Sequence, residues 1–163
     1  MEQFVFLWED HFRLTREYVF AAVYDLHASA VEARLLATVA AQGENLGHLL
    51  NNAALGRQFG ALLHEHIRIA GEIVGAAIAG RSVVRLNATW RANARQIAVF
   101  LAPLVHLPVA AIRNHMVMHL STTLAEAVEI VHHRDGLEAG DVALFHVRQM
   151  ALALHDAIKN LRP

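Results

Sequence analysis

Apolar residues recur at intervals of three and four along almost the whole chain, whereas runs of β-branched residues are short and alanine is abundant. This spacing places apolar side chains on one face of a helix and does not fit the two-residue alternation of a strand. The pattern predicts an all-α protein with a four-helix-bundle-like core and two or three additional connecting helices. The long helices are expected at residues 3–26, 53–79, 109–134 and 139–161.

Local signals place the connecting helices. Ser29 and Glu32 match a capping box, in which a serine hydroxyl and a glutamate carboxylate satisfy amide donors at a helix start. Glycine and proline then mark the ends of helices. We therefore expect connecting helices at 30–41 (ending at Gln42-Gly43), 45–51 and 83–101 (ending before Pro103). Glycines spaced four apart, Gly43–Gly47 and Gly56–Gly60, are interpreted as close helix contacts.

Composition narrows the classes of fold and function. With 55% apolar and 18% charged residues, the chain of 163 residues is expected to form a single domain, and disorder is excluded. The absence of cysteine excludes disulfide scaffolds, iron–sulfur clusters and thiol catalysis. We find no signal peptide, and the longest apolar run, 97–112, is shorter than the roughly 20 residues that span a bilayer. We therefore expect a cytoplasmic protein without a membrane span.

Histidine is frequent, with 12 copies, and each predicted long helix carries one on its apolar seam. Neutral imidazole is a good ligand for transition metals, and bundles build metal sites from inward side chains of facing helices. The sequence predicts an interior site for a divalent transition metal (Zn, Cu, Fe or Ni), catalytic only if a coordination position stays open. The expected ligands are His11, His66, His119, His146 and Glu126, supported by Thr15, Thr123, Asp10 and Asp141.

Other interpretations of these features remain open. The four histidines would equally serve as core residues that hydrogen-bond to one another, to threonines or to water. The apolar segment 97–112 would support a metal-free homodimer if it lay on the surface. The arginines from Arg81 to Arg113 lack interleaved aromatic residues, which is more typical of a solvated helix face than of a surface that binds anions or nucleic acid. No nucleic-acid partner is therefore expected.

Two short internal similarities indicate a duplicated arrangement. His11 and His119 each begin a His-x-x-x-Thr pattern, and His66-Ile-Arg resembles His146-Val-Arg. Such a duplication would relate residues 1–80 to residues 81–163 and would place the histidines about a pseudo-twofold axis.

The chain resembles a family of small bacterial helical proteins over most of its length, in Trp8-x-Asp10-His11-x-x-Leu14-Thr15-Arg16, Leu62-Leu63-x-Glu65-His66-Ile67-x-Ile69-Ala70, Trp90-x-x-Asn93-Ala94-x-x-Ile97-Ala98-x-Phe100-Leu101 and His119-Leu120-x-x-Thr123. The resemblance implies a helical bundle and assigns no activity. Residues 102–108 are more apolar than in that family, and Arg95-Gln96 stands where acidic residues are usual. A looser similarity to DinB-like bundles implies a metal-dependent transferase or hydrolase with ligands His48, His115 and His119.

Overall fold

The all-α class is confirmed by the computed structural model, which describes residues 2–161 and contains six helices and no strand within that range. The helices are α1 (Glu2–Val23), α2 (Ala28–Leu49), α3 (Ala53–Ile78), α4 (Val84–Leu104), α5 (Val109–Val131) and α6 (Leu137–Lys159). Their lengths run from 21 residues in α4 to 26 in α3. The connecting elements are therefore as long as the helices expected to form the core.

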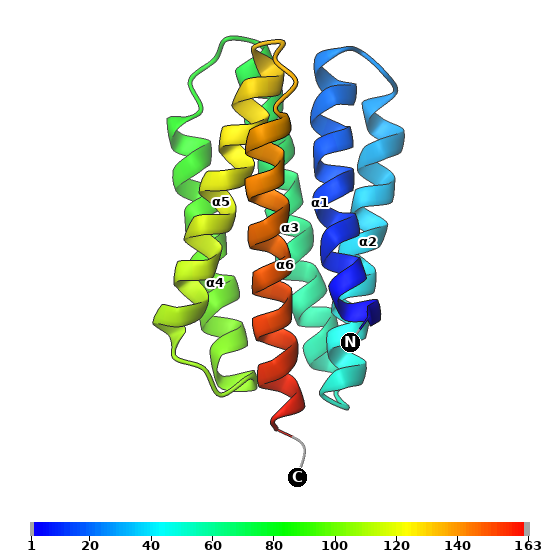
Figure 1. The fold of residues 1–163 in the computed structure, drawn as a ribbon, viewed down its shortest axis with the longest axis vertical. Helices are drawn as coiled ribbons and strands as arrows, with labels where there is room; N and C mark the ends of the chain where they lie inside the picture. The colour runs from blue at the N-terminus through cyan, green and yellow to red at the C-terminus, as the bar shows by residue number, and fades with distance from the viewer. Residues whose placement is uncertain (1, 162–163) are drawn as a thin grey trace.

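The six helices form an up-and-down bundle in which each runs antiparallel to the one before it (Figure 1). Consecutive helices pack against each other, and α1 also packs against α6, which closes the ring. The odd-numbered helices α1, α3 and α5 run in the same direction and contact one another across the interior. Side chains at similar heights on these three helices can therefore meet, and this geometry positions the candidate site.

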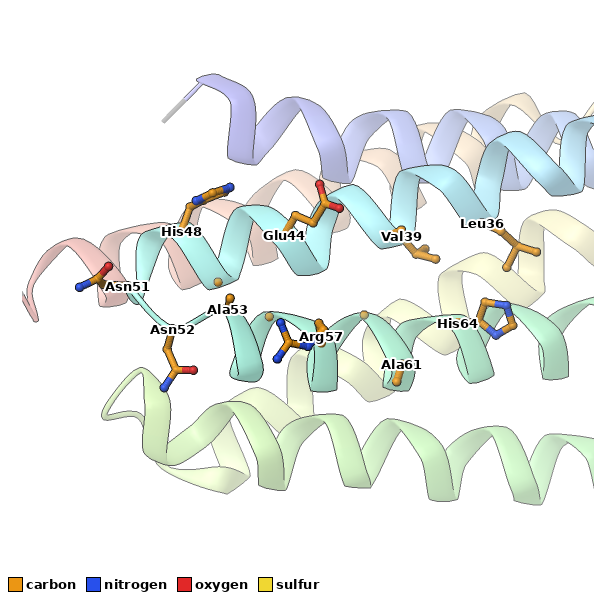
Figure 2. A pocket seen from close by; sticks show the side chains of 14 residues that line it. Leu36, Val39, Glu44, His48, Asn51, Asn52, Ala53, Arg57, Ala61 and His64 are labelled. Atoms are coloured by element: carbon orange, nitrogen blue, oxygen red, sulfur yellow. The ribbon is translucent and has the colours of Figure 1, made fainter.

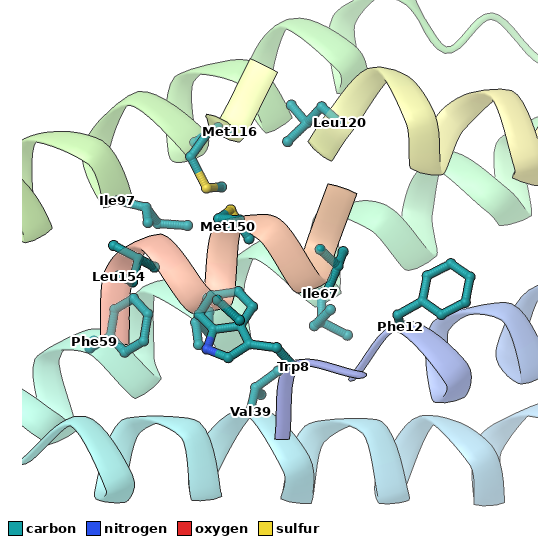
Figure 3. Packing of buried hydrophobic residues seen from close by; sticks show 14 of the residues in the cluster. Trp8, Phe12, Val39, Phe59, Ile67, Ile97, Met116, Leu120, Met150 and Leu154 are labelled. Atoms are coloured by element: carbon teal, nitrogen blue, oxygen red, sulfur yellow. The ribbon is translucent and has the colours of Figure 1, made fainter. Parts of the chain in front are cut away.

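Large apolar side chains from all six helices fill the interior (Figure 3). Trp8 of α1 packs against Phe59 of α3, with ring centroids 6.4 Å apart. Ile97 of α4 and Met150 of α6 belong to the same buried cluster. Burial of each such side chain stabilises the fold by about 1.5–3 kcal/mol relative to an exposed position.

The expected break in the second helix is wrong. α2 continues through Gly43 as one helix, and it begins after His27, whose backbone is left-handed (φ 55°) and whose side chain makes no cap. Ser29 therefore lies inside the helix and does not cap it. Gly43 is required by the neighbouring helix, because a Cβ there would lie 2.7 Å from the carbonyl oxygen of Gly56. The predicted close helix contact between these glycines is confirmed.

The apolar segment 97–112 is divided between the core and the surface. Ile97, Leu101 and Ile112 are buried, whereas Val99 and Val109 are exposed. The homodimer expected to use this segment stays a prediction. Within residues 2–161, no helix combines the length and the apolar character needed to cross a bilayer.

The two internal similarities fall on helices that are not equivalent. His11 and His119 lie on α1 and α5, whereas His66 and His146 lie on α3 and α6. The helices α1 and α3 are parallel and are separated in sequence by α2, but α5 and α6 are consecutive and antiparallel. The helices that carry one pair of patterns therefore differ in order and direction from those that carry the other, and the duplication of residues 1–80 and 81–163 stays a prediction.

Candidate functional site

Three of the four seam histidines meet at the centre of the bundle. His11, His66 and His119 extend from α1, α3 and α5 and are only 3%, 2% and 5% exposed. The ring centroid of His119 lies 6.1 Å from that of His11 and 5.8 Å from that of His66. Trp8 and Trp90 flank the cluster, with centroids 6.3 Å from His11 and 5.0 Å from His66. We call the three residues the histidine triad.

The orientation of His66 is fixed by two side chains of α4. The Nδ1–H of His66 donates to Oδ1 of Asn93 at 2.7 Å, and the Asn93 amide nitrogen donates to the carbonyl oxygen of Leu62 at 3.1 Å. Trp90 donates its indole N–H to the carbonyl oxygen of His66 at 3.1 Å. Sequence reasoning assigned no role to either residue, although their i, i+3 spacing places both on one face of a helix.

Two ring nitrogens of the triad make no hydrogen bond of normal geometry within the described range, although the side chain of Gln42 lies close enough to His11 to raise its pKa. They are Nδ1 of His11 and Nε2 of His66, and both are buried. Because Nδ1 of His66 carries the proton, its Nε2 presents a lone pair to the interior. His119 approaches Thr123 instead, with 3.5 Å between its Nδ1 and the threonine Oγ1.

Burial keeps the triad neutral at physiological pH. Loss of hydration lowers the pKa of His11 from 6.5 to about 3 and that of His66 to about 4. The same cause lowers the pKa of His119 well below its usual value, and the neighbouring histidines lower it further. Asp10 and Gln42 partly oppose the shift at His11. The lone pairs of the triad are therefore free of protons, which metal coordination by imidazole requires.

His146 does not join the triad. It is half-buried on α6, and its Nε2–H donates to the carbonyl oxygen of His115 on α5 at 2.9 Å. The rings of His115 and His146 lie 5.8 Å apart between centroids. The structure thus divides the expected four-histidine set into a buried triad and a separate, more exposed pair.

Glu126, expected as a ligand or base, lies elsewhere. Its buried carboxylate forms an ion pair with Arg16, which also donates to the carbonyl oxygen of Asp135 at 2.8 Å. The pair fits beside α6 because Gly140 has no side chain: a Cβ there would lie 2.6 Å from Oε1 of Glu126. Burial raises the pKa of the Glu126 carboxyl, while Arg16 opposes that rise. The ion pair joins α1 to α5, and the hydrogen bond to Asp135 joins α1 to the turn between α5 and α6.

Four residues were expected to support the metal ligands, and Thr123 is the one of them whose side chain lies within hydrogen-bond distance of a triad ring. The Thr15 hydroxyl donates to the carbonyl oxygen of His11 at 2.8 Å. Asp10 accepts hydrogen bonds from Arg13 at 2.6 Å and from Thr38 at 3.1 Å. Asp141 is exposed on α6. These positions correct the expectation that Asp10 and Asp141 would accept imidazole N–H groups.

A groove of about 810 Å³ runs along α2 and α3 (Figure 2), and none of the triad residues lines it. His48 and His64 line it, together with Glu44 and Arg57. His48 is exposed on α2, whereas His119 is buried in the core. The structure therefore does not gather the DinB-like ligand set into one site.

Within residues 2–161, no three or more His, Cys, Asp or Glu side chains are already placed to hold a metal ion. The triad rings converge, but their nitrogens do not meet at one point in this conformation. Comparison with family models, curated proteins and solved structures gave no match.

Proposed function

We propose that the histidine triad binds a single transition-metal ion in the core of the bundle. The observation that carries the proposal is the pair of buried, unpartnered nitrogens on His11 and His66. A buried polar atom without a partner costs about 1–3 kcal/mol, so a ligand that satisfies both atoms would recover that free energy. His66 offers a neutral lone pair on Nε2, and His11 and His119 place two further neutral imidazoles beside it, which is a donor set that suits a metal cation.

The surroundings of His66 support this proposal. A metal-binding histidine usually donates its second ring N–H to an oxygen, which fixes the tautomer and the direction of the lone pair. The contact between His66 and Asn93 has this form and leaves Nε2 directed away from the amide. Zinc–nitrogen bonds of about 2.0–2.1 Å require the three rings to turn and draw together from their present separations. His146 and Glu126 are not part of the proposed site.

The proposed function is metal binding rather than turnover. The triad residues are at most 5% exposed, so a substrate has no direct access to an ion held between them. Imidazole donors suit zinc, copper, iron and nickel, and the proposal does not depend on which of these the protein takes from the cytoplasm. A buried ion of this kind would hold α1, α3 and α5 together.

Untagged protein titrated with Zn²⁺ tests the proposal. We expect one ion per chain and a stabilisation of about 2.7 kcal/mol when free zinc is about one hundred times Kd. For a chain of this size that corresponds to a rise in Tm of about 5–10 °C. His66→Gln should lose both effects, whereas His132→Gln, which changes an exposed histidine of the α5 C-cap, should keep them. Equal Tm values with zinc and with chelator would refute the site and leave a bridging water as the partner of the two nitrogens.

A further inference from the structure

The triad is sealed, and this raises the question of how an ion reaches it. Its three residues are almost fully buried between α1, α3 and α5. Two other histidines, His115 and His146, lie near His119 and are more exposed than the triad. His115 stands one helical turn before His119 on α5, and residues four apart on a helix are neighbours on its surface.

The two histidines of this outer pair face each other across the α5–α6 contact. The ring centroids of His115 and His146 are 5.8 Å apart, and both side chains are half-buried. Electrostatic repulsion from His146 is among the causes that lower the pKa of His119. The outer pair therefore lies at the partly exposed contact between α5 and α6, one helical turn from His119.

The hydrogen bond of His146 prepares its ring as a ligand. Because Nε2–H donates to the carbonyl oxygen of His115, the lone pair of the neutral ring is on Nδ1. A backbone carbonyl is a usual partner for the second nitrogen of a metal-binding histidine. Two imidazoles with open coordination positions hold a divalent ion less tightly than three, which suits a site that takes up an ion and releases it inward.

We propose that His115 and His146 form a second, solvent-facing site for a divalent transition metal, through which the ion reaches the buried triad. The transfer part of this inference rests on the proposed function, whereas binding by the outer pair does not. In the transfer, water ligands leave the ion and imidazole nitrogens replace them; the histidines stay neutral and no electron moves.

Binding by the outer pair is tested with Cu²⁺ on ¹⁵N-labelled, untagged protein. In the His66→Gln variant, whose triad is incomplete, substoichiometric Cu²⁺ should broaden the amide signals around residues 115 and 146 before any others. The same experiment on the wild-type chain, with Cu²⁺ in excess over the triad, needs no altered fold and should broaden these signals as well. Broadening that is uniform, or centred on exposed histidines such as His132, would overturn the outer site.

Transfer is tested by the rate at which Co²⁺ absorption from the triad appears after mixing. His115→Gln and His146→Gln should each slow this rate by about tenfold while the final absorption stays the same. His132→Gln is the matched control on α5 and should load at the wild-type rate. Equal rates in all four proteins would overturn the transfer. A wild-type chain that takes up no Co²⁺ would instead refute the triad as a metal site, and the copper experiment would then decide the outer pair alone.

Discussion

The direction of the His66 lone pair depends on a single amide side chain, that of Asn93. We expect Asn93→Ala to lower the free energy of unfolding by about 1–3 kcal/mol, because a buried N–H of His66 loses its partner and the carbonyl oxygen of Leu62 loses a second donor. The variant should also weaken zinc binding by about 10–100-fold, as removal of an orienting partner does at other metal sites. Urea unfolding and a zinc titration measure the two effects.

The matched control for this substitution is Thr89→Ala, one turn earlier on α4. Thr89 is exposed, and its hydroxyl donates to a carbonyl of its own helix. We expect a change within about 0.5 kcal/mol and unaltered zinc affinity. If Asn93→Ala behaved like this control in both measurements, the amide would not orient His66.

The helical spacing of apolar residues predicted which histidines are buried, but it did not predict which side chains contact one another. The 3.6-residue pattern placed His11, His66 and His119 on inward seams because each lies between large apolar residues at helical spacing. His146 fits the same pattern, yet the buried stripe of α6 runs through Val147 and leaves His146 at its edge. Glu126 pairs with Arg16, which is 110 residues away in the sequence. The spacing of residues within one helix cannot predict such a contact.

At the scale of helices, the close approach of α2 and α3 depends on glycine. A Cβ at Gly56 would lie 2.5 Å from the carbonyl oxygen of Gly43 and 2.9 Å from Cα of Gly47, and backbone atoms cannot move aside singly. We expect Gly56→Ala to lower the free energy of unfolding by about 1–3 kcal/mol through overpacking. The matched control is Gly75→Ala on the same helix, where no atom lies within 4 Å. That variant should be stabilised by about 0.4–1 kcal/mol, so urea unfolding should give changes of opposite sign.

The same contact explains why helix boundaries were predicted unevenly. Gly80 and Gly136 adopt φ values of 64° and 63°, and at both positions the chain turns as the sequence predicts. Gly43 has the same local signature as a helix breaker, but α2 continues through it because the helix is held against Gly56. Helix propensity alone does not distinguish a glycine that ends a helix from a glycine that allows a neighbouring helix to pack closely.

At the scale of the whole molecule, the number of long helices decided which residues meet. A four-helix core would bring four seams together. In the six-helix ring, α1, α3 and α5 contact one another across the interior, whereas α6 packs mainly against α1 and α5. That arrangement unites the triad and leaves His146 on α6 with His115. The hydrophobic pattern predicts the class of fold. Which histidines meet depends on how the six helices are arranged in the ring, and the sequence of a single helix does not determine that arrangement.

The buried triad makes the stability of the whole bundle dependent on pH. The folded-state pKa values of His11 and His66, about 3 and 4, lie below the ordinary 6.5. Below about pH 6.5 the unfolded chain therefore binds more protons than the folded one, and the free energy of unfolding falls as the pH falls toward these folded values. Each such histidine contributes up to about 1.4 kcal/mol per pH unit. Urea unfolding between pH 7.5 and 5, with chelator present, measures the slope.

A variant isolates the histidine contribution from that of the acidic residues. The raised pKa of Glu126 acts in the opposite sense, since it makes the folded state bind more protons. His119→Gln removes one neutral imidazole and should reduce the slope by up to about 1.4 kcal/mol per pH unit, whereas the exposed His132→Gln should leave it unchanged. Identical slopes for His119→Gln and the wild-type chain would mean that the triad accepts protons without unfolding. The core would then be open to water at low pH, and the sealed site on which the metal proposals depend would have to be abandoned.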